Sequence, residues 1–415
     1  MTAFTPVWRV RIQGVDYTDV TIANLTITSG RTDIYRQPVA GYCSVQLLNF
    51  NAEPVVVDVN DGITIEVQDS NATYVPIFGG LISDIDNQIT SAGSVDYVQT
   101  LTITALGALS KLPFSLWEGS LSQDFEGDQI YAILSSLLLG QWNEVSPSVT
   151  LNTYNATETW ANAVNQGLGE IDQPGNYEMI SRAASAIDSY TLVSDLATSG
   201  LGYIYEDAQG NIGYADSTHR SQNLAANGYT EISAAQGIAV GTRILLRLGD
   251  IRNSVIVYSG NNFSDDSADT EPTSIATYGT RAFTVNTYLK NKADAEAQAQ
   301  EYMDLRAWPQ NQLGDVTFPL GNSNIDDTDR DALLNVYMGM PIKLTGLPAN
   351  MNLGEFTGFV EGWTFRAGYN SLSISIFVSP TAFSLRSMKW NDVGVLETWN
   401  TISNTLEWID ATIVA

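Results

Sequence analysis

Histidine and cysteine each occur once in this sequence of 415 residues. The single histidine, His219, excludes Ser-His-Asp and Cys-His catalysis and any two-histidine metal site, unless a partner chain completes the site. We expect His219 to be an exposed loop residue. The single cysteine, Cys43, excludes an intramolecular disulfide and a Cys-based zinc site. Its neighbours alternate as in a strand, which predicts a buried thiol.

Basic residues are also few. Nineteen lysines and arginines stand against 46 acidic residues, which gives a formal net charge of −27. This balance argues against a protein that wraps nucleic acid, because such proteins use Lys and Arg to displace counterions from phosphates. It is compatible with DNA that passes without adhering, since like charges repel. It is equally compatible with a charge that only keeps the protein soluble.

Long apolar segments are absent as well. No run approaches the ~18 residues that a membrane span requires, so we expect no membrane segment. Residues 1–8 lack a basic stretch followed by an apolar core, so we expect no signal peptide and synthesis in a cytoplasm. Glycine is plentiful, with 33 residues, and this suits a chain of many short strands.

Three strand-like motifs from the first part of the chain recur in the same order near its end. The pairs are 62–67 with 339–344, 78–82 with 356–360, and 100–104 with 371–375. One such match would be weak, because alternation is common to all half-buried strands. Three in order predict an internal duplication of a small β-barrel. Three copies of such a chain, closed by cyclic symmetry, would place six similar barrels around an axis.

The predicted fold class is α+β, mainly β, with two similar small β-barrel (tube-like) domains. An α+β insertion lies between them, and a tail follows. The expected units are a first barrel at 1–109, an α+β insertion at 110–242, a second barrel at 243–260 and 311–380, a small insertion with an acidic loop and a helix at 261–310, and a Trp-containing C-terminal tail at 381–415.

Within the two insertions, periodicity and caps predict a few elements. Apolar residues at helical spacing follow Asp128, a second helix begins at Asp188 or Ser189 and ends at a left-handed Gly200, and a third runs from about Lys292 to Ala307. A hairpin is expected around 207–210. Residues 143–178 are polar and unpatterned, which predicts a long surface loop.

Two acidic segments have an ambiguous chemistry. Residues 327–331 carry the alternate carboxylates of a calcium loop, but Ala332 and Met338 replace the Gly and Glu that an EF-hand requires. We expect a solvated turn there, and a disordered acidic loop at 264–271. No glycine-rich phosphate loop is present. We therefore assign no catalytic, cofactor-binding or metal-binding residue and expect no cofactor and no enzyme.

Short patterns spread over nearly the whole chain resemble phage tail-tip hub proteins, also called minor tail or baseplate hub proteins. These patterns are Trp8-x-Val10-x-Ile12-x-Gly14, Gly30-Arg31, Pro38-x-Ala40-Gly41, Leu47-x-Asn49, Pro76-Ile77-Phe78-x-Gly80, Gly200 to Tyr205 with Asp207-x-x-Gly210, Tyr278-Gly279-x-Arg281, and Val378-Ser379-Pro380 followed by Trp390-x-Asp392 and Trp399. Each is a structural pattern rather than a catalytic one, so their order carries the resemblance.

The resemblance implies a structural virion protein of the tail tip, assembled in the host cytoplasm. It would be a homotrimer whose two tube-like barrels per chain give pseudo-sixfold symmetry around the DNA exit channel. The implied partners are a distal tail or tail tube protein, the tape measure protein, and tail fibre or spike proteins, with genomic DNA passing without specific binding. The alternative is a carbohydrate-binding or glycan-hydrolysing protein, because two carboxylates suffice for glycoside hydrolysis.

The last segment carries the suspected partner-docking residues Trp390, Trp399 and Trp408. They lie nine residues apart, which places neighbours on opposite faces of a helix or a strand. Each therefore anchors its own short segment. Buried tryptophan contributes strongly to interfaces, so the tail either docks on a neighbouring subunit or tail protein, or packs back on its own second barrel.

Overall fold

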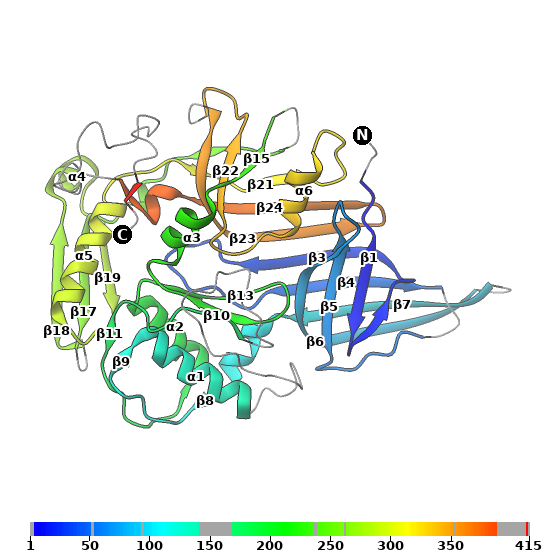
Figure 1. Cartoon of the computed structure of the whole chain (residues 1–415), viewed down its shortest axis with the longest axis horizontal. Helices are drawn as coiled ribbons and strands as arrows, with labels where there is room; N and C mark the ends of the chain where they lie inside the picture. The colour runs from blue at the N-terminus through cyan, green and yellow to red at the C-terminus, as the bar shows by residue number, and fades with distance from the viewer. Residues whose placement is uncertain are drawn as a thin grey trace.

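A computed structural model describes residues 4–50, 54–92, 95–140, 168–235, 239–260, 263–351, 354–387 and 412–413. The fold is mainly β with helices between the strands, as the sequence predicted, and Figure 1 shows the chain in one view. None of the described helices combines the length and the apolar character that a membrane crossing requires.

One large, predominantly antiparallel sheet organises the molecule. Its pairing order is β15 (Thr230–Ser233), β22 (Pro341–Thr345), β23 (Phe356–Gly368), β3 (Thr21–Gly30), β4 (Tyr42–Asn49), β7 (Val95–Leu106), β6 (Tyr74–Ala92), β5 (Gly62–Gln68), β1 (Trp8–Ile12) and β2 (Val15–Tyr17), with β24 (Ser371–Pro380) beside β23 and β21 (Val316–Pro319) beside β24. Strands β1 to β7 form the first half, and β15 with β21 to β24 form the second. The pairing of β3 with β23 joins the two halves.

Alternation along each strand explains why the sheet has one buried face. In β4, Cys43, Val45 and Leu47 are buried, while Ser44 and Gln46 face the other way. The same period of two runs through the neighbouring strands, as it must when one face is covered. One apolar core extends under both halves. The expected burial of Cys43 is confirmed.

The repeated motifs form two meanders with the same strand order. Strands β5, β6 and β7 pair in sequence in the first half, and β22, β23 and β24 do so in the second. Each meander has a β-bulge between its second and third strands, where Ser83 or Glu361 has no opposite residue. These two residues lie 278 positions apart (361 − 83), the same offset as the Phe78 and Phe356 motifs. A β-bulge occurs at a specific position in a given sheet, so the matching positions of these two bulges support a duplication.

A second detail recurs at the start of each meander. The Asn60 N–H donates to the Ile82 carbonyl at 2.7 Å, and the Gly339 N–H donates to the Val360 carbonyl at 2.7 Å. Asn60 and Gly339 both have a positive φ, 73° and 84°, a conformation that Gly and Asn tolerate best. Their offset is 279 (339 − 60), whereas the sequence motif predicted 277. The predicted alignment of this first strand was therefore wrong by two residues.

The two predicted barrels are not found as separate closed units. The described strands pair along an open path with β2 at one end and β15 at the other, and the two halves share their core. The physical reason is the β3–β23 pairing, which merges the halves into one sheet. Strand β15, expected in the insertion, also belongs to this sheet through its parallel pairing with β22.

A second core lies beside the large sheet and includes most of the remaining elements. The elements that contribute residues to it or pack against it are η1 (Ala108–Phe114), β8 (Leu116–Trp117), α1 (Glu126–Gly140), β10 (Leu168–Ile171), β11 (Glu178–Met179), β12 (Ile187–Asp188), α2 (Ser189–Ser199), β13 (Tyr203–Glu206), β14 (Ile212–Ala215), β17 (Ser254–Ser259), β19 (Ala282–Asn286) and α5 (Lys292–Arg306). The other elements of this part of the chain are β9 (Asp124–Phe125), α3 (His219–Asn227), β18 (Asp265–Thr270) and α4 (Pro272–Tyr278). Figure 1 shows β17, β18 and β19 with α5 at the opposite end of the molecule from β1. Strand β17, expected in the second barrel, pairs with β18 and β19 instead.

Several local expectations are confirmed and others are corrected. The Asp188 cap accepts from the Thr191 N–H at 2.8 Å, and the 207–210 hairpin forms between β13 and β14. Residues 265–270 form strand β18 rather than a disordered loop, because they pair with the buried strand β17. The expected turn at 327–331 is helix α6 (Asp327–Leu334), capped by Asp326. Strand β10 interrupts the predicted surface loop, and Leu201 rather than Gly200 has the positive φ.

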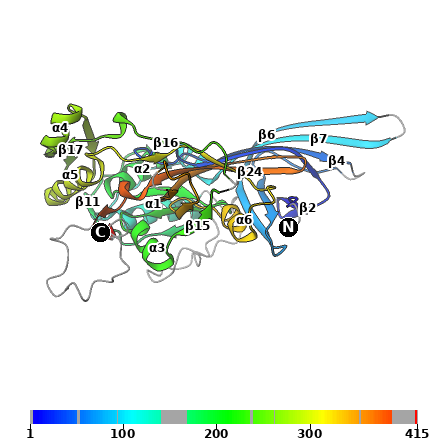
Figure 2. The same ribbon diagram turned by 90° about the horizontal axis from the view of Figure 1, so that it is seen from above.

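Strands β6 and β7 continue beyond the body of the molecule. In Figure 2, which views the molecule from above, they extend as a hairpin past the ends of the neighbouring strands. In this outer part the two strands pair with each other from Asp84 to Ala92. On the other side of β6 lies β5, whose pairing with β6 stops at Leu81. The edge of β6 beyond its bulge is therefore open among the described residues.

Candidate functional site

The joint between the halves depends on a close approach of two backbones. Gly30, at the end of β3, has a φ of 80°, and a Cβ there would lie 2.3 Å from the Glu361 carbonyl oxygen. Any side chain at this position would force the strands apart. The next residue, Arg31, donates its N–H to the same carbonyl at 2.8 Å. The bulge residue Glu361 is thus held where β3 leaves the sheet.

The Glu361 side chain is completely buried and lies between two arginines. Arg31 Nε donates to it at 2.8 Å, and Arg220 donates through Nη1 and Nη2 at 2.7 and 3.0 Å. Burial alone would raise the pKa of Glu361, but the two guanidinium groups outweigh burial and lower the pKa to about 2. Because Arg220 comes from α3, this cluster connects the first half, the second half and α3.

The matching position in the first half is different. Ser83 replaces the buried glutamate and donates to the Asp84 carboxylate at 2.9 Å. Of the strand residues that follow, Asp84, Asp86, Asn87 and Gln88 are polar and exposed. Ile85 is partly buried against the core, and Ile89 is apolar and 57% exposed. A long edge with unpaired backbone groups is a site where another strand can add.

A second open edge lies in the second half of the molecule. The segment from Val240 to Leu245 runs antiparallel to 312–317, through a bridge between Val240 and Thr317 and through the pairing of β16 (Ile244–Leu245) with β20 (Gln312–Leu313). In the second half, this segment therefore lies beside β21 in the same way as β3 lies beside β4 in the first half. Its outer side has no described partner strand, and Val240 and Leu246 are 44% and 63% exposed.

The outer face of the sheet carries mostly small polar side chains. Hydroxyl groups dominate it over five neighbouring strands, as in the contact of Thr28 with Thr364 at 3.5 Å. Twelve of the residues whose side chains share this face are Thr26, Thr28, Ser44, Gln46, Asp84, Asp86, Thr102, Thr104, Thr364, Arg366, Ser373 and Ser375. Among these twelve, one arginine and two aspartates are charged.

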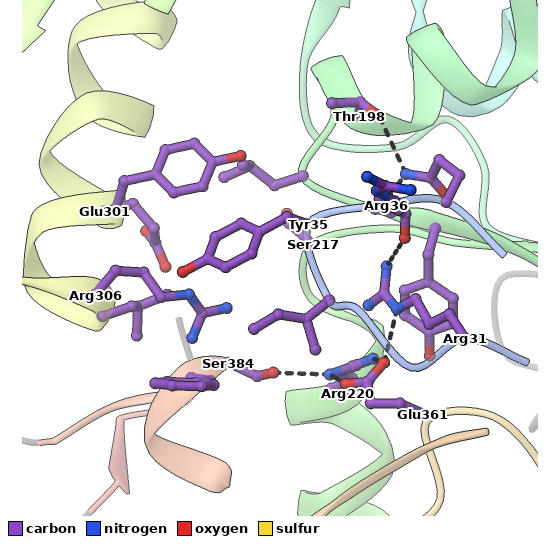
Figure 3. A pocket seen from close by; sticks show the side chains of 18 of the residues that line it. Arg31, Tyr35, Arg36, Thr198, Ser217, Arg220, Glu301, Arg306, Glu361 and Ser384 are labelled. Atoms are coloured by element: carbon purple, nitrogen blue, oxygen red, sulfur yellow. Dashed lines mark hydrogen bonds and ion pairs between the residues drawn. The ribbon is translucent and has the colours of Figure 1, made fainter. Parts of the chain in front are cut away.

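A pocket lies where the joint, α2, α3 and α5 meet (Figure 3). Its volume is about 150 Å³. Tyr35 lines it and donates its hydroxyl to the Asp250 carbonyl at 3.0 Å, and Phe283 packs 5.3 Å from the Tyr35 ring. Four arginines from three segments line the pocket: Arg31 and Arg36 from the loop after β3, Arg220 from α3 and Arg306 from α5. The Arg36 side chain is mostly exposed and pairs with Asp33.

His219 is buried and not the exposed loop residue that the sequence predicted. It is the first residue of α3, and its Nδ1 lies 2.8 Å from the Asp172 carboxylate. Burial would lower the pKa of His219, but the hydrogen bond to Asp172 outweighs burial and raises it. Glu170, Asp172 and His219 place three potential metal-ligand atoms within 4.8 Å of one another. Since Nδ1 is used by Asp172, we interpret the cluster as an ion pair that joins the end of β10 to α3.

Two further buried glutamates, Glu206 and Glu126, have no cationic partner like those of Glu361 within the described part of the chain. Glu206 accepts from the N–H groups of Gly41 and Leu109 and so attaches β13 to the first half. Glu126 accepts from the N–H groups of Asn176 and Tyr177. Burial raises the pKa of each to about 7.

The docking residues predicted from the sequence, Trp390, Trp399 and Trp408, lie outside the described residues. Of the residues in the joint, the Gly30-Arg31 pattern was visible in the sequence and Glu361 was missed. Its signal was a glutamate within the apolar run from Phe359 to Trp363. A charge in such a strand indicates a buried partner.

No protein-family model matches the chain, and no curated protein matches it in sequence. Solved structures do match. The tail protein from Neisseria meningitidis aligns with a TM-score of 0.57 at 10% identity, over 92% of this chain and 98% of its own. The 43 kDa tail protein of prophage MuSo2 from Shewanella oneidensis aligns with a TM-score of 0.56 at 11% identity, over 91% and 98%. The resemblance to phage tail proteins is thus confirmed at the level of the fold.

Proposed function

We propose that this chain is a structural protein of the virion, the hub of a phage tail tip or baseplate, without an enzymatic role. Three copies form a ring that surrounds the DNA exit channel and adapts the sixfold tail tube to threefold tip proteins. The observation that carries the proposal is the duplicated meander with its matched bulges, in a fold shared with two tail proteins.

The ring follows from repeating the joint that the chain already contains. Within one chain, β3 of the first half pairs with β23 of the second, immediately after the bulge. The counterpart of β3 in the second half is the open segment at Val240–Leu245. The counterpart of β23 in the first half is the open edge of β6. If the same pairing joins the second half of one copy to the first half of the next, the contact is head-to-tail and closes by rotation.

The internal joint also predicts the register between copies. The positions of the two bulges show which residue of β6 corresponds to which residue of β23. In the same way, the pairings of β4 and β21 with their neighbouring strands show that Asn24 in the first half corresponds to Val240 in the second. Thr28 pairs with Thr364 inside the chain, and the equivalent residues are Ile244 of one copy and Asp86 of the next. The full set of predicted antiparallel pairs is Val240 with Thr90, Gly241 with Ile89, Thr242 with Gln88, Arg243 with Asn87, Ile244 with Asp86, and Leu245 with Ile85.

Side-chain exposure supports this contact. Ile89 on the β6 edge and Val240 and Leu246 on the other edge are among the exposed large apolar residues of the molecule. Apolar side chains on an open strand edge favour association. Arg247, at the position equivalent to Arg31, would meet Asp84, which follows the position equivalent to Glu361. The predicted contact therefore contains an ion pair of its own.

The hydroxyl-rich face of the sheet is the proposed wall of the channel. A wall with few cations lets DNA pass because it does not replace the counterions of the phosphates. Arg366 is the single arginine among those twelve residues of this face, and Asp84 and Asp86 outnumber it. This composition supports passage of genomic DNA without specific binding.

The remaining parts of the proposal concern neighbours and units. A distal tail or tail tube protein and the tape measure protein would lie on one side of the ring, and tail fibre or spike proteins on the other. The protein would be at the tail tip of the virion after assembly in the host cytoplasm. For the units we propose the division predicted from the sequence, 1–109, 110–242, 243–260 with 311–380, 261–310 and 381–415, with two changes. Strand β15 belongs with the second half of the large sheet, and strand β17 belongs with β18 and β19.

Two measurements test the ring and its register. Size-exclusion chromatography with light scattering gives the number of copies in the purified full-length protein, with three expected. Cysteine pairs then report the register. Asp86→Cys with Ile244→Cys should form intermolecular disulfides on mild oxidation, because directly opposite residues in antiparallel strands lie within disulfide range.

Asp86→Cys with Thr242→Cys is the matched control, two residues out of register, and should cross-link far less. The buried Cys43 does not compete. A monomer under all conditions contradicts the ring. A trimer that cross-links only through the control pair contradicts the register but leaves the ring intact.

A further inference from the structure

The pocket in Figure 3 contains a cation that lacks a hydrogen-bond acceptor. Arg306 ends α5, and its side chain reaches toward Tyr35. Its Nε and Nη1 atoms are buried and have no hydrogen-bond partner among the residues that the structure describes. Its guanidinium lies 4.2 Å from the Phe383 ring and 5.7 Å from the Tyr35 ring. These rings and the C-terminal end of the helix stabilise the charge, but they do not accept its N–H groups.

Among the described residues, none of the carboxylates that line the pocket forms an ion pair with Arg306. The Arg36 side chain is 83% exposed and pairs with Asp33 at 3.5 Å. The largely buried arginines of the pocket are therefore Arg31, Arg220 and Arg306, and its carboxylates are Asp216, Glu301 and Glu361. Glu361 is already shared by Arg31 and Arg220. Asp216 accepts from the backbone N–H groups of Thr218 and His219. Within the described part of the chain, Glu301 forms no ion pair with Arg306, although both line the pocket.

A buried arginine whose N–H groups have no acceptor makes the folded state less stable than a neutral side chain at the same position would. Burial accordingly lowers the pKa of Arg306. In a chain with a formal charge of −27 and only 19 basic residues, three arginines (Arg31, Arg220 and Arg306) around one small cavity are a strong local concentration. Arginine is the side chain that recognises carboxylate and phosphate groups through paired N–H donors.

We propose that this pocket binds an oxyanion, a carboxylate or a phosphate group, and that Arg306 is its principal donor. The volume of about 150 Å³ suits a small anionic group. The elements that line the pocket all belong to one chain, so the proposal goes beyond the ring and does not depend on it.

The test is thermal unfolding of the full-length protein in increasing inorganic phosphate or acetate, with sodium chloride keeping the ionic strength constant. The melting temperature of the wild type should rise with at least one anion, because a ligand that binds the folded state stabilises it. Arg306→Gln should weaken the apparent affinity by roughly 10- to 100-fold, since it removes charge-assisted hydrogen bonds. Arg366→Gln removes an exposed arginine outside the pocket and should titrate like the wild type.

The two anions distinguish the source of the ligand. A response to phosphate alone assigns a phosphoryl group, and a response to acetate as well assigns a carboxylate such as an acidic side chain. Arg306→Lys keeps the charge but not the planar fork, so its affinity should lie between those of the wild type and Arg306→Gln. Because the charge of Arg306 is uncompensated, Arg306→Gln should unfold without anion at the wild-type temperature or above it. Equal anion titrations of wild type and Arg306→Gln overturn the proposal, as does the absence of any response in the wild type.

Discussion

The two halves of the large sheet share one strand order, but the edge that is paired in the second half is open in the first half among the described residues. After the bulge at Glu361, β23 pairs with β3, and the bulge residue is buried between two arginines. After the bulge at Ser83, β6 has an open edge, and the residue at the bulge is a small hydroxyl. A repeated backbone therefore does not carry repeated chemistry. The side chain at the bulge differs between the edge that is paired within the chain and the edge that is open among the described residues.

Glu361→Gln should reduce the stability of the protein more than any other single substitution proposed for the two halves. It leaves the guanidinium groups of Arg31 and Arg220 buried without their carboxylate, and removing one partner of a buried ion pair costs about 3–5 kcal/mol. Ser83→Ala, the same strand position in the first half, should change the free energy of unfolding by no more than about 0.5 kcal/mol. Urea unfolding at one protein concentration measures both.

A replacement of the whole cluster is the control for Glu361→Gln. Combining Glu361→Leu with Arg31→Met and Arg220→Met should recover most of the lost stability, because well-packed apolar side chains replace buried ion pairs at little cost. Equal losses for Glu361→Gln and Ser83→Ala would contradict the distinction between the two bulges.

The second prediction compares Glu361 with Glu206, the buried carboxylate that attaches β13 to the first half through N–H groups alone. The folded-state pKa of Glu206 is about 7 against an ordinary value of 4.5. The folded state therefore binds more protons between these pH values, and the free energy of unfolding should fall as pH rises through them. The contribution is about 3 kcal/mol at most for one such group.

Glu206→Gln should flatten this part of the pH profile, measured as urea midpoints between pH 4.5 and 8. Glu126 has the same raised pKa, so the flattening is partial. Glu231→Gln, which removes an exposed carboxylate, should leave the profile unchanged. The pKa of Glu361 is lowered to about 2, so its contribution should instead be lost only as pH falls below 4.5. Parallel profiles for wild type and Glu206→Gln would mean that Glu206 does not titrate in this range.

The third prediction tests the proposed ion pair at the open edge. Arg247→Asp and Asp84→Arg should each weaken the proposed trimer, by about 1 kcal/mol per contact, because each places like charges together at a partly exposed site. The two changes combined restore opposite charges and should recover the wild-type dissociation profile in light scattering at decreasing concentration. Recovery is the decisive observation, since additive losses would show that the two residues do not meet.

The strands were the most predictable part of the fold. Alternation of apolar and polar residues marked β4 and the repeated motifs, and it predicted the buried thiol of Cys43. The same alternation could not fix their alignment, because a shift of two residues leaves every side chain on its original face. The first motif, at Gly62, was misaligned in this way. Only the bulges and the hydrogen bonds of Asn60 and Gly339 reveal the equivalence.

The parts that the sequence did not predict depend on partners far along the chain. Residues 265–270 are polar, and they form a strand because β17 offers buried backbone groups to pair with. His219 is buried because Asp172, 47 residues away, accepts its Nδ1 hydrogen bond. Glu361 meets Arg31 across 330 residues. Local patterns do not contain such contacts, so a charged cluster of this kind has to be found in three dimensions.

The C-terminal tail is a further difference between the halves, since it follows only the second. Trp390, Trp399 and Trp408 lie outside the described residues, and their spacing of nine still predicts three separate anchors rather than one stripe. Replacing all three by alanine should leave the urea midpoint of the purified protein within about 0.5 kcal/mol if the tail docks on another tail protein. Incorporation into assembled particles should then fall strongly, because buried tryptophans dominate the energy of interfaces. If the tail instead packs back on the second half, the variant should lose several kcal/mol of stability, as Trp→Ala changes in a core do. Unchanged stability together with unchanged incorporation would show that the three tryptophans are not docking residues.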